Sequence, residues 1–273
     1  DKDVVWQLDF QKKGGGGWTG VNSLSWKRIA TGPLEPHRLH HGRMTGLEPG
    51  GEYNYRLLQD GTQVFEASFR SRKGPGQPHR CIVVADCGFG SEQQRAVAYQ
   101  MYQQQPDLVV IPGDIVYVSG TISEYRSKFY PIYNSPKASP RSGAPLMRST
   151  PFLAGLGEHD WRWWTVQDPG WQHDQEGGLA YFLYWFQPLN GPPAYHGGPN
   201  TYPIRTADKD GLNNLLDTMG RNYPVMAHYS FDYGNSHWTI LDSNPHVDWT
   251  DPNLRDWLRN DLATAADARW RFV

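Results

Sequence analysis

The stretch DLVVIPGDIVY, residues 107–117, decides the fold of this chain. Four consecutive apolar residues, 108–111, are followed by a Pro-Gly pair, which is typical of a strand buried on both faces. In open α/β sheets, ligands bind at the carboxyl ends of such strands. Asp114 and Tyr117 stand at that end, and their oxygen atoms are hard ligands suited to iron or another oxygen-loving cation.

A second apolar stretch, CIVVAD at residues 81–86, ends in the same way. Ser91 then predicts the start of a helix, and Pro106 predicts its end. A strand, a helix and a strand form a right-handed parallel unit, so we expect Asp86 and Asp114 to emerge side by side. Two carboxylates placed together can bridge a pair of metal ions.

A third short apolar strand, PFLAGLG at residues 151–157, delivers a polar triplet to a sharp turn. Within that triplet, Glu158 can ligate a metal ion, and His159 can donate a proton or hold a phosphoryl oxygen. The sequence therefore predicts a site at the ends of three strands.

Residues 1–73 show a different pattern, that of an all-β domain. Short segments lie between Gly and Pro turns, and in LEPGGEYNYRL, residues 47–57, a Pro-Gly turn precedes an alternating strand. A tyrosine after such a corner is typical of the tyrosine corner of immunoglobulin-like sandwiches. Residues 73–78 are polar and rich in turn formers, which indicates a linker to a second domain over residues 74–273.

Composition excludes several classes of protein. The net charge of −2 over 273 residues gives no signal for nucleic acid or a membrane surface, and no apolar run is long enough to span a bilayer. Cys81 and Cys87 lie roughly 20 Å apart on an extended chain, too far for a disulfide, and we interpret them as free thiols. His37, His40 and His41 lie in the β-rich part, where we interpret them as solvated rather than metal-binding.

Three motif blocks carry a resemblance to a known family. Asp-x-Gly at Asp86, Gly-Asp-x-x-Tyr at residues 113–117 and Gly-x-His-Asp at residues 157–160 resemble the first blocks of the calcineurin-like metallophosphoesterases. The tyrosine of the second block resembles the purple acid phosphatase branch, and so do the hairpin at residues 229–243 and the Leu-x-Pro-Gly-x-x-Tyr-x-Tyr-Arg motif at residues 47–56. The resemblance implies an α/β fold: a four-layer αββα sandwich, incomplete at the C-terminus, preceded by an all-β fibronectin III-like sandwich.

The resemblance also implies a chemistry. Phosphate esters, either small molecules or phosphorylated substrates, would be hydrolysed by a metal-bound hydroxide at a dinuclear centre of Fe(III) with Zn, Mn or Fe(II). Asp86 and Tyr117 would bind the first metal, Asp114 would bridge, and Glu158 would bind the second. His159 would act as the catalytic residue that steadies the transition state or protonates the leaving group. A secreted or periplasmic location is implied as well.

Two departures from the family pattern qualify this expectation. The Val-x-x-His and Gly-His-x-His blocks that supply three histidine ligands do not occur, so we expect a C-terminally truncated fragment that is inactive and poor in metal. His228 has Val-x-x-His spacing but precedes the hairpin, the wrong place for a ligand, and His237 is expected to be structural. Glu158 replaces the family's asparagine, and its charge about 4 Å from a phosphoryl group would cost up to about 4 kcal/mol at an effective dielectric near 20.

Three other interpretations stay open. One is the sandwich-bearing branch of calcineurin-like alkaline phosphatases and phosphodiesterases, some of which carry an acidic residue at the third block. Another is a non-catalytic member of the family that binds phosphorylated ligands, with Glu158 as a sign of lost activity. The last is an unrelated α/β binding module, which would show no metal dependence.

Overall fold

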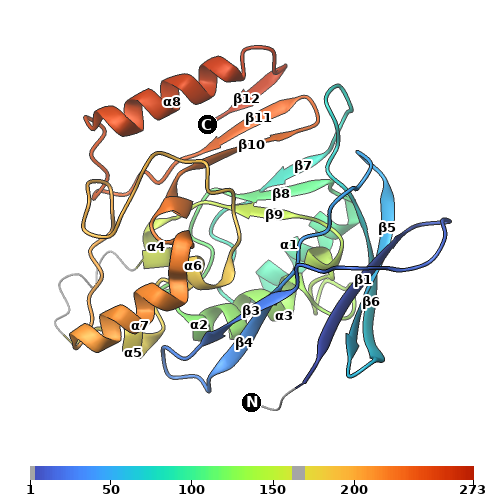
Figure 1. Cartoon of the computed structure of the whole chain (residues 1–273), viewed down its shortest axis with the longest axis horizontal. Helices are drawn as coiled ribbons and strands as arrows, with labels where there is room; N and C mark the ends of the chain where they lie inside the picture. The colour runs from blue at the N-terminus through green and yellow to red at the C-terminus, as the bar shows by residue number, and fades with distance from the viewer. Residues whose placement is uncertain (1–3, 162–169) are drawn as a thin grey trace.

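The computed structural model describes residues 4–161 and 170–273, which form a mixed α/β protein with four sheets (Figure 1). The first two sheets are antiparallel and lie in the N-terminal part. One has the strand order β2-β1-β5-β6, and the other pairs β3 with β4. These strands are β1 Trp6–Lys12, β2 Thr19–Gly20, β3 Ser25–Ile29, β4 His37–His41, β5 Glu52–Gln59 and β6 Thr62–Arg70.

Tyr53, the tyrosine after the Pro-Gly turn, lies at the start of β5 and bonds back to the backbone of that turn. The Glu48 backbone N–H donates a hydrogen bond to the Tyr53 hydroxyl oxygen at 2.8 Å, and the Tyr53 ring stacks on Phe69 of β6. Tyr53 is buried, so its ring contributes apolar contact while its polar end fixes the turn.

A parallel sheet with the order β7-β8-β9 lies at the centre of the chain. Strand β7 is Cys81–Val83, β8 is Leu108–Ile111 and β9 is Phe152–Ala154. Helix α1, Glu92–Gln103, connects β7 to β8, and the Ser91 hydroxyl caps it by accepting the Gln94 N–H. The predicted strand-helix-strand unit is therefore confirmed, although β7 ends two residues before the end of its apolar stretch.

Strand β8 is buried on both faces, as its four apolar residues predict. Val109 and Ile111 belong to the larger core, together with Ala98 and Met101 of α1. Leu108 and Val110 belong to a second cluster with aromatic residues of the following sheet. Full burial of each such side chain stabilises the fold by about 1.5–3 kcal/mol.

The second cluster packs the central sheet against a sheet of order β10-β11-β12. Strands β10, Tyr229–Tyr233, and β11, Ser236–Ile240, form a hairpin that turns at Gly234-Asn235. Strand β12, Trp270–Phe272, pairs in parallel with β11, and helix α8, Pro252–Thr264, connects the two. Figure 1 shows α8 beside this sheet and α1 on the other side of the central sheet.

The remaining elements are short and lie between the strands of the central sheet or between β9 and β10. They contribute buried aromatic residues such as Tyr125 and Tyr181. The α-helices are α2 Ile122–Glu124, α3 Tyr130–Tyr133, α4 Glu158–Trp161, α5 His173–Glu176, α6 Ala180–Tyr184 and α7 Lys209–Met219. Residues Tyr125–Phe129 form one π-helical turn, and Leu146–Arg148, Gly220–Asn222 and Val225–Ala227 form 3-10 turns.

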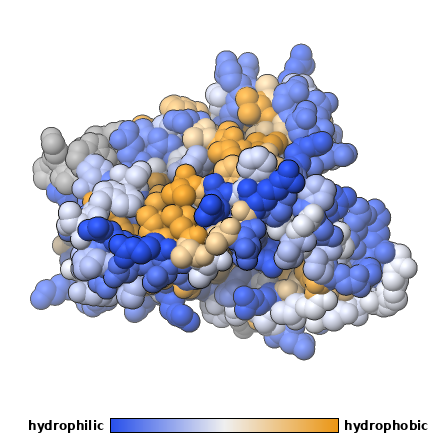
Figure 2. Space-filling model, turned by 90° about the horizontal axis from the view of Figure 1, so that it is seen from above, coloured by the Kyte–Doolittle hydropathy of each residue, from blue (hydrophilic) through white to orange (hydrophobic). Residues whose placement is uncertain are grey.

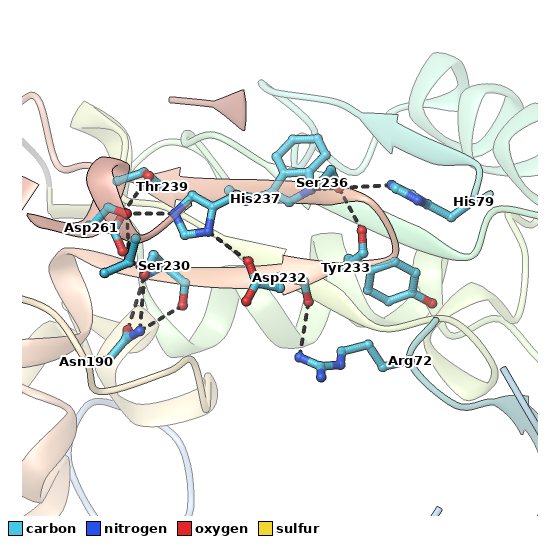
Figure 3. Close-up of polar contacts among 12 residues, drawn as sticks. Arg72, His79, Asn190, Ser230, Asp232, Tyr233, Ser236, His237, Thr239 and Asp261 are labelled. Atoms are coloured by element: carbon cyan, nitrogen blue, oxygen red, sulfur yellow. Dashed lines mark hydrogen bonds and ion pairs between the residues drawn. The ribbon is translucent and has the colours of Figure 1, made fainter. Parts of the chain in front are cut away.

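The face of the β10–β11 hairpin that turns away from the central sheet is polar. Figure 3 shows that Ser230, His237 and Thr239 project from this face and meet Asp261 of α8. The hairpin thus presents aromatic residues to the central sheet and hydrogen-bonding groups to α8, because successive side chains of a strand point to opposite faces.

The face of the molecule shown in Figure 2 carries hydrophobic residues in its middle, surrounded by hydrophilic ones. Strand β12 lies at the edge of its sheet, and Phe272 and Val273 are exposed there. Among the described residues, no helix combines the length and the apolar character needed to cross a membrane.

Candidate metal centre

Three strand ends meet at one edge of the central sheet. Because β7, β8 and β9 are parallel neighbours, the residues that follow each strand lie close together. Asp86 and Asp114 both have left-handed backbone conformations, with φ of 54° and 52°. Such values are uncommon outside glycine and mark tight turns, here directly after a strand.

Two glycines allow these turns to approach one another. A Cβ atom at Gly157 would lie 2.1 Å from the Asp114 amide nitrogen, and one at Gly88 would lie 2.0 Å from the Ile115 carbonyl oxygen. Neither position has room for a side chain. The Asp-x-Gly and Gly-x-His-Asp spacings therefore have a steric reason, since they let the three loops pack together.

Tyr117 joins the first two strand ends. Its hydroxyl donates to Asp114 Oδ2 at 2.9 Å and makes a very short contact with Asp86 Oδ1. Burial raises the pKa of Tyr117, and the hydrogen bonds to both carboxylates raise it further. The phenol therefore stays neutral in this arrangement and would ionise only if a cation replaced its proton.

The third strand end adds a second group of possible metal ligands around Asp114. Ligand atoms of Asp114, Glu158 and His159 all lie within 4.8 Å of one another. The His159 backbone N–H donates to Asp114 Oδ1 at 3.0 Å, and the imidazole Nε2 lies 3.9 Å from Glu158 Oε1. Glu158 and His159 begin the short helix α4, whereas the sequence predicted a turn there.

Asp160 supports this geometry, and the sequence assigned it no role. It is fully buried, and its two carboxylate oxygens accept the backbone N–H groups of Ile115 and Gly157 at 3.0 and 2.9 Å. Burial raises the pKa of Asp160 to about 8, with the backbone hydrogen bonds acting in the opposite direction. Asp160 thus ties the loop after β8 to the loop after β9.

Phe89 is a second neighbour that sequence reasoning missed. Its ring stacks on Tyr117 with the centroids 4.2 Å apart, while the His159 ring lies 4.1 Å from Tyr117. Phe89 is 58% exposed, so it borders the site from the solvent side. Its place three residues after Asp86 was the available signal, but nothing local indicates which way the ring turns.

The other histidines, which the sequence analysis did not assign as metal ligands, have hydrogen-bond partners away from these strand ends. The Asp242 backbone N–H donates to His228 Nδ1 at 3.2 Å, so the proton of the neutral ring lies on Nε2 and no lone pair remains for a metal. His37 Nε2 lies 2.9 Å from the Tyr184 hydroxyl. Both ring nitrogens of His237 contact carboxylates, at 2.8 and 3.0 Å.

The site as a whole suits cations. Within residues 4–161 and 170–273, no lysine or arginine forms an ion pair with Asp86, Asp114 or Glu158. Two carboxylate charges about 4 Å apart repel by about 4 kcal/mol at an effective dielectric near 20. Carboxylate and phenol oxygens favour hard cations, and imidazole favours Zn²⁺ or Fe²⁺, so these residues fit a metal centre.

Comparisons with known proteins agree with this fold. No protein-family model matches the chain, and no curated protein matches it by sequence. The structure is similar to that of a purple acid phosphatase, PPD1, isolated from seeds of yellow lupin (Lupinus luteus), with a TM-score of 0.66 and 18% identity. It is also similar to the structure of PhoD, with a TM-score of 0.52 and 15% identity.

Both similarities extend over 99% of this chain but cover only 46% of the lupin protein and 55% of PhoD. The chain therefore spans about half the length of these solved structures. At such identities the likeness concerns the fold, and for the fold the expected resemblance to purple acid phosphatases is confirmed.

Proposed function

We propose that this chain carries part of the active centre of a metal-dependent phosphoric ester hydrolase, similar to the purple acid phosphatases. One observation supports this most directly: Asp114 belongs to two ligand groups at once. One of its oxygens meets the Tyr117 hydroxyl beside Asp86, and its carboxylate also lies beside Glu158 and His159. A shared carboxylate between two groups is what a dinuclear centre requires.

Each residue would then have a defined role in metal binding. Asp86 and Tyr117 would hold the first cation through oxygen, Asp114 would bridge, and Glu158 would hold the second. Bound cations of this kind lower the pKa of water and neutralise phosphoryl oxygens, which is the chemistry that ester hydrolysis needs. Fe(III) suits the all-oxygen group, and Zn²⁺, Mn²⁺ or Fe²⁺ suits the other.

We extend the proposal to the domains. Two three-stranded sheets that pack face to face, with α1 and α8 outside them, support a four-layer αββα sandwich over residues 74–273. The tyrosine corner and the two antiparallel sheets support a fibronectin III-like sandwich over residues 1–73. A secreted or periplasmic location rests on the resemblance alone.

Glu158 favours a particular substrate charge. Its side chain is 53% exposed, and its carboxylate adds a negative charge beside the place where a phosphoryl group would bind. Repulsion scales with the charge of the substrate, so a monoanionic diester would suffer less than a dianionic monoester. This observation supports a second candidate function, that of a phosphodiesterase of the calcineurin-like alkaline phosphatase and phosphodiesterase type.

The colour of the iron-loaded protein tests the first metal position. We expect a visible phenolate-to-Fe(III) charge-transfer band that Tyr117→Phe abolishes. Tyr102→Phe is the matched control, because Tyr102 is an exposed tyrosine of α1 and belongs to none of the motif blocks. A band that survives Tyr117→Phe would remove this residue from the centre.

Hydrolysis tests the substrate class. Glu158→Asn removes one negative charge and should shift the ratio of monoester to diester turnover by at least tenfold toward the monoester, or about 1.4 kcal/mol. Equal losses on both substrates would show instead that glutamate is a working ligand. Binding of metal and phosphate without hydrolysis of either ester would agree with the non-catalytic alternative and also with the inactivity expected of this chain.

A further inference from the structure

A groove with apolar walls lies between the N-terminal sheets and the rest of the chain. Its volume is about 500 Å³, which is within the range of small-molecule sites. The walls come from three separate segments, within residues 44–72, 147–153 and 231–233. Among the described residues that line the groove there is no candidate metal ligand. The large apolar side chains of the walls, all partly buried, are Met44, Leu47, Phe69, Met147, Leu153 and Phe231.

The walls of this groove suit a flexible apolar ligand. Met44 and Met147 are unbranched side chains that adapt to irregular shapes, and methionine is common at surfaces that accept varied ligands. The groove is open to solvent along its length rather than closed around a fixed shape. An alkyl chain can follow such walls by changing its torsion angles, whereas a rigid ring cannot.

Two arginines that line the groove are held by neutral oxygen atoms. Arg148 Nε donates to Asn134 Oδ1 at 2.9 Å, and its Nη2 donates to the Asn134 carbonyl oxygen at 3.0 Å. Arg72 Nη1 donates to the Asp232 carbonyl oxygen at 3.3 Å. Figure 3 shows the Asp232 carboxylate turned toward His237 instead. Within residues 4–161 and 170–273, no carboxylate forms an ion pair with either guanidinium.

We propose that this groove binds an amphipathic anion, an unbranched alkyl chain that ends in a carboxylate. The chain would lie along the apolar walls, and Arg72 and Arg148 would bind the carboxylate. A guanidinium has five N–H donors, and the contacts above use one donor of Arg72 and two of Arg148. Arg70 also lines the groove, but Glu52 and Asp107 neutralise its charge. The inference does not depend on a metal or on hydrolysis.

A ligand in this groove would contact two parts of the chain. Leu47 and Phe69 belong to the N-terminal part, whereas Leu153 lies in β9 and Phe231 in β10 of the two packed sheets. Binding would therefore add contacts between these parts. Because the groove exists only in the folded chain, the ligand should also raise the thermal midpoint of unfolding.

Calorimetric titration of the 273-residue chain with hexanoate, octanoate and decanoate tests the apolar part of the site. Excess EDTA in the buffer removes bound cations, so carboxylate binding at the candidate metal centre does not contribute. We expect one saturable site whose affinity rises by up to about fourfold for each added methylene, or about 0.8 kcal/mol. No saturable binding of octanoate, or an affinity that does not change with chain length, would overturn the proposal.

Substitutions test the polar part. The double variant Arg72→Gln with Arg148→Gln should bind octanoate at least about tenfold more weakly, because charge-assisted hydrogen bonds are lost. Its affinity for octanol, which has the same chain without the charge, should not change, and this shows that the groove is intact. Arg255→Gln, a change at an exposed arginine of α8, is the matched control and should leave octanoate binding unchanged.

A further variant tests the position of the alkyl chain. Met147→Glu places a negative charge in the apolar wall and should weaken the binding of both octanoate and octanol. Equal octanoate affinity in wild type and in the double arginine variant, or in wild type and Met147→Glu, would overturn the proposal. These measurements need no turnover, so they are independent of whether the chain hydrolyses phosphate esters.

Discussion

Two histidines of this chain lie beside two carboxylates each, and they differ in how closely those carboxylates approach. Both ring nitrogens of His237 contact carboxylate oxygens, Asp232 at 2.8 Å and Asp261 at 3.0 Å (Figure 3). His159 gives one nitrogen to a backbone carbonyl at 2.9 Å, and its other nitrogen stays 3.9 Å from Glu158.

The difference in distance separates a structural histidine from a candidate ligand. A ring with two carboxylates at hydrogen-bond distance must donate from both nitrogens, so His237 is an imidazolium that holds the β10–β11 hairpin to α8. His159 has one nitrogen beside the Val118 carbonyl oxygen and belongs to the candidate metal-ligand group around Asp114. Four experiments test this distinction between the two histidines.

The largest effect is expected at Asp261. Its carboxylate accepts from Ser230, His237 and Thr239, and its side chain is 9% exposed. Asp261→Asn leaves a buried imidazolium with one charged partner fewer, and we expect the free energy of unfolding in urea to fall by about 3–5 kcal/mol. Asp256→Asn, on the exposed side of α8, should cost less than about 1 kcal/mol. Similar costs for the two variants would contradict a structural role for His237.

Zn²⁺ should stabilise the fold through the group of Asp114, Glu158 and His159, and not through the His237 cluster. At about 100 times the dissociation constant, a ligand that binds only the folded state adds about 2.7 kcal/mol. We expect Zn²⁺ to raise the thermal midpoint of wild type and of His237→Gln, but not of Asp114→Asn, which loses the carboxylate shared by the two ligand groups. Loss of the zinc effect in His237→Gln would mean that the metal binds at His237, where the β10–β11 hairpin contacts α8.

The pH dependence of stability should come from His237. Burial alone would lower its pKa, but the hydrogen bonds to Asp232 and Asp261 outweigh burial and raise it. The stabilisation is therefore complete below the unfolded value of about 6.5 and is lost as the pH rises through the raised folded value. Urea unfolding at a series of pH values should show this decline in wild type, and His237→Gln should flatten it.

The smallest effect is expected at Asp232. Its side chain is 71% exposed, and exposed ion pairs contribute about 0–1 kcal/mol. Asp232→Asn should lower the free energy of unfolding by less than about 1 kcal/mol, although it removes a hydrogen bond of 2.8 Å. A cost equal to that of Asp261→Asn would show that exposure does not distinguish the two partners.

Much of the fold was predictable because its signals are local. The apolar run at residues 108–111 is buried on both faces, Ser91 caps α1, and Asp251 caps α8. The hairpin within residues 229–243 and the free state of both cysteines also agree with prediction. The helical start at Glu158 was missed because the glycines of residues 151–157 indicate a turn at least as strongly.

Which residues stand at the strand ends follows from the order of residues in the chain. Apolar runs mark parallel strands, and parallel strands bring their carboxyl ends to one edge, so residue order alone groups Asp86, Asp114 and Glu158. Tertiary structure alone decided how these groups are used. The Val118 carbonyl fixes the proton of His159, Asp114 is shared by two ligand groups, and Asp261 closes on His237 from another element. These facts depend on ångström-scale distances between segments remote in sequence, which residue order and hydrophobic period do not encode.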